Sequence, residues 1–292
     1  MSDISIFCKS YRDDLERAAD LVETLRRFNR NSLALYISVP KTDLASFKAR
    51  IGAVDVNWVS DEDVVAANSA IDLGAYSKLP GQLRQQIVKA EFWRINPAGN
   101  YFCVDSDSRF IRDFSASDFL SPDGTPYTVL HEGKAILEAS LINGIDEAIP
   151  AFEAAARRMQ EKFGRTGPLY NFGPFPVVWS AKVWRALLSR LEAENTTILE
   201  AIAAYPYEAS WYGETLLKYR PVALLPRDPI FKAYLYLEDY ERDRRAGVDE
   251  QVLAQFYLGV VYQSNWYPKR LQPLKRLAYK AKRQIRRWRQ RP

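Results

Sequence analysis

The first half of the chain alternates short apolar runs with segments in which apolar residues recur every three to four positions. The runs have the length expected of buried strands, and the spaced segments are typical of amphipathic helices. We expect strands at 4–10, 32–40, 54–60 and 101–107. We expect helices between them at 15–28, 43–52 and 81–95. This alternation predicts α/β layering, in which helices cover the faces of a central sheet.

The second half has a less regular pattern. The expected elements are a strand at 125–133, helices at 146–163 and 181–195, an aromatic, proline-rich loop at 168–180 that runs into a strand, and a helix followed by a strand within 208–226. No internal repeat or low-complexity linker interrupts the chain. We therefore expect one α/β domain with a mixed central sheet at 1–266, followed by a tail at 267–292.

Composition narrows the class of protein. With 292 residues, 47% of them hydrophobic and 26% charged, the chain has the make-up of an ordinary soluble globular protein. It contains no run of the roughly 18 to 20 apolar residues that a membrane-spanning helix needs, and its first residues lack the layout of a signal peptide. Cys8 and Cys103 lie in separate apolar runs with no Cys or His cluster, which favours buried, reduced thiols and a cytoplasmic setting.

Basic charge is concentrated at the C-terminus. Of the 41 Lys and Arg residues, eleven lie from Lys269 onward among no acids, so 30 remain in the rest of the chain against 36 Asp and Glu. The apolar residues of this segment recur at three- and four-residue intervals, at Leu271, Leu274, Leu277, Ala281, Ile285 and Trp288. This pattern predicts a basic amphipathic helix at 269–291 that lies on an anionic membrane surface.

Three alternatives for the basic segment remain open. It could pack as a helix on the body with its charges solvated, form a disordered tail, or bind RNA. We favour the membrane surface, because the acidic body offers no wider face for a nucleic acid. No nucleic acid is therefore expected as a partner.

The run YFCVDSDSRF, at 101–110, ends in two aspartates separated by one residue. In open α/β sheets ligands bind beyond the carboxyl ends of the strands, which is where Asp105 and Asp107 are expected. Two carboxylates in a partly dry cleft need a compensating charge, which Mg²⁺ or Mn²⁺ would supply while leaving positions for phosphate oxygens. The alternative is a polar turn that closes a buried strand.

Other candidate metal groups are weaker. His131 is the only histidine, so HExxH and multi-histidine sites are excluded, and we expect it to have a structural role. The acids of SDEDVV, at 60–65, could suggest a metal site. We favour the first turn of a helix, where acidic side chains interact favourably with the helix dipole.

The segment before this strand carries a second signal. It reads G-x-x-R-Q-Q-x-x-K, and the strand ends in D-S-D; the matching residues are Gly81, Arg84, Gln85, Gln86, Lys89, Asp105, Ser106 and Asp107. An E-x-x-x-Y-G pattern follows at Glu208, Tyr212 and Gly213. Over roughly 4–225 the chain resembles the GT-A-fold glycosyltransferases, in particular an uncharacterised bacterial branch. In that branch a proline-rich acceptor segment stands where 168–180 lies here.

The resemblance implies roles for the donor side. Asp105 would contact the ribose or sugar of a nucleotide-sugar and, together with Asp107, would hold Mn²⁺ or Mg²⁺. Gln86 and Lys89 would reach the same donor, and Ser10 and Tyr11 would border its base. The alternatives are an exposed helix lysine for Lys89 and a packing aromatic for Tyr11.

For the acceptor side, the resemblance implies Glu208 as the general base, with Glu214 as the substitute. Trp211 and Tyr212 would form a platform on which an acceptor sugar stacks. The alternative for Glu208 is an exposed acid at a helix start. Many GT-A enzymes also use a C-terminal histidine as a metal ligand, which this chain lacks, so Gln263, Ser264, Asn265 or water would take that position.

These features together predict a metal-dependent glycosyltransferase that moves a sugar from a nucleotide-diphosphate donor, possibly UDP-linked, to a glycan or lipid-linked acceptor. We expect it to act in bacterial surface polysaccharide synthesis, at the inner face of the cytoplasmic membrane. One alternative is a nucleotidyltransferase that makes nucleotide-sugars, although CKSYRDDLE after the first strand lacks the glycine-rich phosphate loop of such enzymes. Another is an inactive membrane- or RNA-associated binding module.

Overall fold

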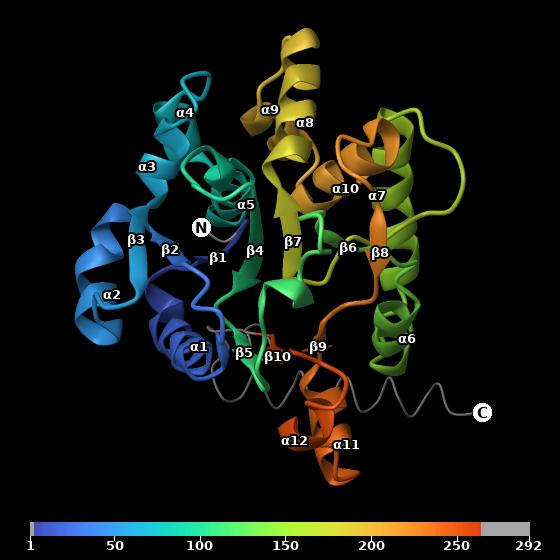
Figure 1. The fold of residues 1–292 in the computed structure, drawn as a ribbon. Coiled ribbons are helices and arrows are strands. Elements are labelled where there is room, and N and C mark those ends of the chain that lie inside the picture. The colour runs from blue at the N-terminus through green and yellow to red at the C-terminus, as the bar shows by residue number, and fades with distance from the viewer. Residues whose placement is uncertain (1–2, 264–292) are drawn as a thin grey trace, which may run out of the picture.

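A five-stranded sheet forms the centre of the molecule. The computed structural model describes residues 3–263, and Figure 1 shows their arrangement. The sheet has the order β3-β2-β1-β4-β7. Its strands are β1 (Ile4–Lys9), β2 (Leu35–Val39), β3 (Val56–Ser60), β4 (Asn100–Asp105) and β7 (Val177–Ser180). The first four pair in parallel and β7 pairs antiparallel with β4, so the sheet is mixed.

Helices cover both faces of this sheet, because its central strands are apolar on both sides. One apolar core includes Phe7 of β1 and Ile87, and the other includes the neighbouring Ile6 and Leu21. The helices that contribute to the first core are α3 (Asp61–Ala66), α4 (Leu73–Lys78), α5 (Gly81–Glu91), α7 (Ala148–Lys162), α8 (Ala181–Ala193), α9 (Ile198–Ala204) and α10 (Glu208–Tyr219). Those of the second core are α1 (Leu15–Phe28) and α2 (Leu44–Ile51). The predicted α/β/α class with a mixed central sheet is confirmed.

Local sequence explains where several helices begin. The Ser60 side chain accepts a hydrogen bond from the backbone N–H of Asp63, and three acids occupy the first turn of α3. Such a cap satisfies a backbone donor that has no partner within the helix. The interpretation of 60–65 as a helix start is therefore confirmed. Thr197 and Glu200 form a reciprocal capping box at the start of α9.

A second, three-stranded sheet has the order β5-β10-β9. It consists of β5 (Ser108–Phe110), β9 (Phe231–Tyr234) and β10 (Gly259–Tyr262), with β10 antiparallel to β5 and parallel to β9. Figure 1 shows α11 (Leu237–Arg245) and α12 (Glu250–Leu253) beyond β9, at the lower end of the view. This small sheet was not expected, because strands of three or four residues leave almost no periodic signal.

The remaining elements differ in part from those predicted for the second half of the chain. A two-stranded parallel sheet pairs β6 (Tyr127–Val129) with β8 (Leu225–Arg227), so the strand expected at 125–133 is much shorter. The helix expected at 146–163 is α7 (Ala148–Lys162), and it is preceded by an unexpected helix, α6 (Lys134–Ile142). Among the described residues, no helix has the length and apolarity required to cross a membrane. The amphipathic segment predicted at 269–291 lies outside the described residues.

Candidate active site

The two aspartates lie at the carboxyl edge of the main sheet, as predicted. Asp105 is the last residue of β4 and pairs in register with Lys9, the last residue of β1. Residues 106–107 form a turn, and β5 begins at the next position. The turn separates the two aspartates into different surroundings.

Asp105 faces a buried lysine. The Lys89 Nζ lies 2.6 Å from Asp105 Oδ1 and 3.7 Å from Glu208 Oε1, and the side chains of Lys89 and Glu208 are only 4% and 9% exposed. The ring of Phe175 covers the same ammonium group at 3.9 Å. The structure therefore excludes the alternatives that placed Lys89 and Glu208 on the exposed surface.

The charges of this cluster are strongly coupled. Burial alone lowers the pKa of Lys89, but Asp105 and Glu208 more than compensate and raise it above its ordinary value. Burial raises the pKa of Glu208, and the nearby lysine opposes that rise. Breaking such a buried pair would leave an uncompensated charge, which is costly. The cluster therefore keeps the contact between Lys89 and Asp105, and this contact holds the Asp105 carboxylate in one orientation.

A second buried ion pair lies beside the first and was not predicted. Lys9 Nζ is 2.9 Å from Asp61 Oδ2, and Ser38 donates a hydrogen bond of 2.6 Å to Asp61 Oδ1. Burial raises the pKa of Asp61, against the lowering effect of Lys9. The sequence offered one signal for this pair, a lysine at the end of an apolar strand. That signal could not identify Asp61 as the partner of Lys9, because Asp61 lies at the end of a different strand.

The other residues predicted to bind the donor are divided between buried and exposed positions. Ser10 and Gln86 are 2% and 5% exposed, and neither Ser10 Oγ nor Gln86 Oε1 has a hydrogen-bond partner among residues 3–263. Tyr11 is 41% exposed and directly precedes the short 3-10 helix Arg12–Asp14, so it lies at a helix start, as the alternative interpretation has it. No contact in the structure tests the predicted roles of these three residues towards a donor.

Asp107 lines an open cavity of about 420 Å³. The cavity lies between the N-terminal half of α1 and the small sheet, and its lining residues are Arg17, Asp20, Ser106, Asp107, Ser108, Arg109, Tyr240, Glu250 and Tyr262. Tyr262 donates a backbone hydrogen bond of 2.9 Å to the Asp107 carbonyl. Gln263, one of the predicted metal ligands, thus follows the residue that contacts Asp107. Ser264 and Asn265 lie outside the described residues.

The platform predicted at Trp211 and Tyr212 is wrong. Both side chains are 2% exposed and belong to the apolar core between the sheet and α10. The Trp211 indole donates to the Tyr205 carbonyl, and the Tyr212 hydroxyl accepts from the Ser180 backbone. Their aromatic faces pack against other core rings, so neither offers a surface for a sugar.

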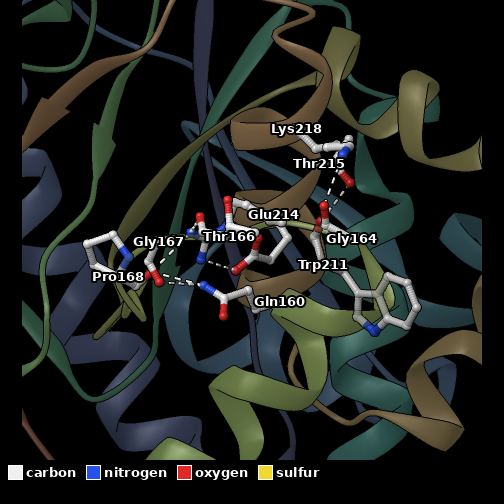
Figure 2. A network of polar contacts seen from close by, with 10 residues as sticks. Gln160, Gly164, Thr166, Gly167, Pro168, Trp211, Glu214, Thr215 and Lys218 are labelled. Carbon is white, nitrogen blue, oxygen red and sulfur yellow. Dashed lines mark hydrogen bonds and ion pairs between the residues drawn. The ribbon is translucent and has the colours of Figure 1, made fainter.

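Glu214 is also unsuited to the role of substitute base. Figure 2 shows it on α10, directed at the loop around 164–168. Its two carboxylate oxygens accept hydrogen bonds of 2.6 and 2.8 Å from Arg165, and it is 2% exposed. Gln160 and Lys218 bind carbonyls of the same loop. This carboxylate fastens a loop to the helix and is closed to substrate.

His131 has the structural role that was predicted. Its Nδ1 accepts a hydrogen bond of 2.9 Å from the Gly133 backbone, and its Nε2 bonds the Gly173 carbonyl. The His131 backbone also pairs with Asn171. The histidine therefore fixes the first part of the aromatic loop at 168–180 and lies outside the cluster of acids.

The acids at the end of β4 suit a divalent cation that takes only one or two ligands from the protein. Among the described residues there is no group of three or more His, Cys, Asp and Glu side chains that could hold a metal ion. Mg²⁺ binds through one or two carboxylates and completes its shell with water and substrate phosphates. The oxygens of Asp105 and Asp107 fit that mode, whereas a closed all-protein cage is not present in this part of the chain.

Comparison with known proteins identifies the family but not its activity. Residues 4–272 match DUF6492, a family of unknown function. The chain belongs to this family. Among solved structures, this DUF6492 member is similar to mouse xyloside xylosyltransferase 1 in the apo form. The two are 10% identical with a TM-score of 0.49, and the match covers 90% of this chain and 99% of that one. No curated protein matches its sequence.

Proposed function

We propose that this DUF6492 chain is a glycosyltransferase that moves a sugar from a nucleotide-diphosphate donor to a glycan or lipid-linked acceptor, with Mg²⁺ or Mn²⁺ bound by Asp105 and Asp107. One observation carries the proposal: Asp107 lines the 420 Å³ cavity at the carboxyl edge of the sheet, directly after an aspartate held by a buried lysine. This edge is the ligand-binding position in open α/β sheets.

The residues around the acids suit an anionic donor. A bound divalent cation would neutralise the leaving diphosphate. Arg17 and Arg109 line the cavity of Asp107 with side chains 37% and 40% exposed, and guanidinium groups are donors suited to phosphate oxygens. Lys89 Nζ, 2.6 Å from Asp105 Oδ1, orients the Asp105 carboxylate. The acids and arginines together can hold a metal–diphosphate group through both its metal and its free oxygens.

The proposal is tested with the variant Asp107→Asn, which keeps the size of the side chain and removes its charge. Calorimetry with UDP, GDP and CDP in Mn²⁺ should show at least tenfold weaker binding of the preferred nucleotide than in the wild type. Asp228→Asn serves as the matched control, because this exposed aspartate lies on the β8–β9 connection, away from the cavity. Its affinity should equal that of the wild type.

Each result has a clear reading. Unchanged nucleotide affinity in Asp107→Asn rejects the metal role of that residue. If the wild type binds none of the three nucleotides, the inactive binding module is the better description. Release of pyrophosphate from a nucleoside triphosphate and a sugar phosphate, without release of nucleoside diphosphate from a nucleotide-sugar, would indicate the nucleotidyltransferase instead.

The location of the enzyme is a separate part of the proposal. We propose that residues 269–291 hold it at the cytoplasmic face of a membrane, where lipid-linked precursors of a bacterial surface polysaccharide would be available. Each of the eleven basic residues near an anionic surface contributes about 1 kcal/mol. A chain ending at Pro268 should no longer sediment with phosphatidylserine vesicles. The full chain should sediment with those vesicles but not with purely zwitterionic ones. Equal sedimentation of both chains would reject the anchor.

A further inference from the structure

A second cavity adjoins the one at Asp107. It has a volume of about 300 Å³ and lies among β9, α11 and the segment around α12. Its lining residues are Tyr234, Tyr240, Arg244, Val248, Asp249, Glu250, Gln251, Leu253 and Tyr262. Most of them come from the part of the chain that follows the main sheet.

The two cavities share three wall residues, Tyr240, Glu250 and Tyr262. The Tyr262 hydroxyl donates a hydrogen bond of 2.8 Å to Glu250 Oε1, which lies 3.6 Å from Arg109 Nε. The backbone of Tyr262 is in turn bonded to Asp107. A ligand in the second cavity would therefore lie next to a ligand held at Asp107.

Aromatic rings form one side of the second cavity. Tyr234 and Tyr262 are nearly parallel, with an interplanar angle of 14° and centroids 6.1 Å apart. Tyr240 stands against both at 74° and 86°, with centroid distances of 5.4 and 5.5 Å. Contacts among the three rings hold each one in place, so the face that lines the cavity has a fixed orientation.

The polar groups of this cavity suit a neutral, hydroxylated ligand better than a phosphorylated one. Asp249 and Glu250 outnumber the single cation, Arg244, and no metal ion is proposed here to offset them as at Asp107, so the lining would repel added negative charge. Carboxylates accept hydrogen bonds from hydroxyl groups, and the amide of Gln251 can both accept and donate them. Tyrosine rings supply a rigid apolar face with a polar tip. Such a mixture recognises the apolar face and the ring hydroxyls of a sugar.

We propose that the cavity bounded by Tyr240, Glu250 and Gln251 is the binding site for a saccharide acceptor, placed beside the donor site at Asp107. This proposal rests on the proposed transferase function and assigns a binding site to its second substrate. Tyr240 and Glu250 lie in the shared wall, where the acceptor hydroxyl would approach the donor sugar. They replace Trp211 and Tyr212, whose burial removes them from this role.

Saturation-transfer NMR on the full chain tests this site, with the methyl glycosides of glucose, galactose, mannose and xylose as probes. At least one glycoside should receive saturation from the wild type. The signal should fall at least tenfold in Tyr240→Ala and several-fold in Gln251→Ala, which removes an exposed side chain and leaves the aromatic cluster intact. Phe256→Ala is the control, because this residue is 74% exposed nearby and does not line the cavity; its signal should equal that of the wild type.

The outcomes separate this site from the donor site. Asp107→Asn should weaken nucleotide binding and keep the glycoside signal, whereas Gln251→Ala, which lines only the second cavity, should do the reverse. If no glycoside is saturated, or if Gln251→Ala leaves the signal unchanged, the saccharide site is rejected. Weaker binding of UDP, GDP or CDP in Gln251→Ala would show that the cavity holds a nucleotide, which also overturns the proposal.

Discussion

Asp105 and Asp107 are two positions apart in the sequence and both half-buried, but they have different neighbours. Asp105 contacts a lysine that is 4% exposed, within a cluster closed by Phe175 and Glu208. Asp107 lines a cavity of about 420 Å³ together with Arg17, Asp20, Arg109 and Glu250, whose side chains are 37% to 57% exposed. The comparison shows that a short acidic motif can place one carboxylate against a buried cation and the next on the wall of an open cavity.

The turn at 106–107 produces this difference. In a continuing strand, residues two apart point to the same face of the sheet. Here β4 ends at Asp105, and the chain turns into β5, which pairs with β10 in the small sheet. Asp107 is thereby carried to the junction between the two sheets.

The largest expected effect is on the buried side of the comparison. Lys89→Met keeps the volume of the side chain but leaves Asp105 and Glu208 without their cation, and loss of one partner of a buried pair costs about 3 to 5 kcal/mol. Urea denaturation should show a destabilisation of this size at pH 7. The loss should be smaller near pH 4, because burial has raised the pKa of Glu208 and the acid is then protonated in the folded state.

Lys48→Met provides the control for this prediction. Lys48 is exposed on α2, so its substitution should change the free energy of unfolding by no more than about 0.5 kcal/mol. A similarly small effect of Lys89→Met would mean that the cluster contributes no net stability. In that case the contrast between Asp105 and Asp107 would not extend to the free energy of unfolding.

A smaller effect is expected on the open side. A Cβ atom at Gly259 would lie 2.1 Å from the Phe231 ring and 2.4 Å from the Arg109 carbonyl, so Gly259→Ala must displace backbone where β10 meets β5. Overpacking of this kind costs about 1 to 3 kcal/mol. The variant should also bind nucleotide more weakly in Mn²⁺, because β5 and β10 shape the cavity of Asp107. Calorimetry measures the affinity.

Gly81→Ala is the matched substitution on the buried side. Nothing lies within 4 Å of an added Cβ at this helix start, so stability and nucleotide affinity should both be retained. If Gly259→Ala behaves like Gly81→Ala in both measurements, the small sheet does not set the geometry of the cavity.

The effect that is smallest at neutral pH, because it develops only above about pH 8.5, concerns the thiols beneath the buried cluster. Cys8 and Cys103 are fully buried, and burial raises the pKa of each thiol above its ordinary value. Their contribution to stability is therefore complete below the unfolded pKa of about 8.5 and declines at higher pH by about 1.4 kcal/mol per pH unit for each thiol.

Unfolding in urea at pH 8 to 10 measures this decline. A variant with alanine at both cysteine positions should lose stability less steeply with pH than the wild type. Equal slopes, or rapid labelling of either thiol in the folded protein, would show that water reaches the strand ends on this side.

Much of the first half of the fold was predictable from the sequence. Its four strands and the helix at 81–95 have long apolar signals, and β4 was expected to end in the acidic motif, as it does. The tertiary contacts corrected other interpretations. Trp211, Tyr212 and Glu214 were taken for accessible residues because their pattern on α10 does not distinguish a substrate face from a face packed against a loop.

The sequence alone determined the layered α/β class and the acids at the strand end, because strand and helix periods are local properties of the chain. Only the tertiary structure decided which charges are paired and which cavities exist. Lys9 meets Asp61 across 52 positions, at the ends of two different strands of the main sheet. Tyr262 meets Asp107 across 155 positions, through a strand too short to carry a pattern. The burial of each charged group, and the strength of its interactions with other charges, depend on those distant contacts. The local spacing of residues in the sequence does not predict them.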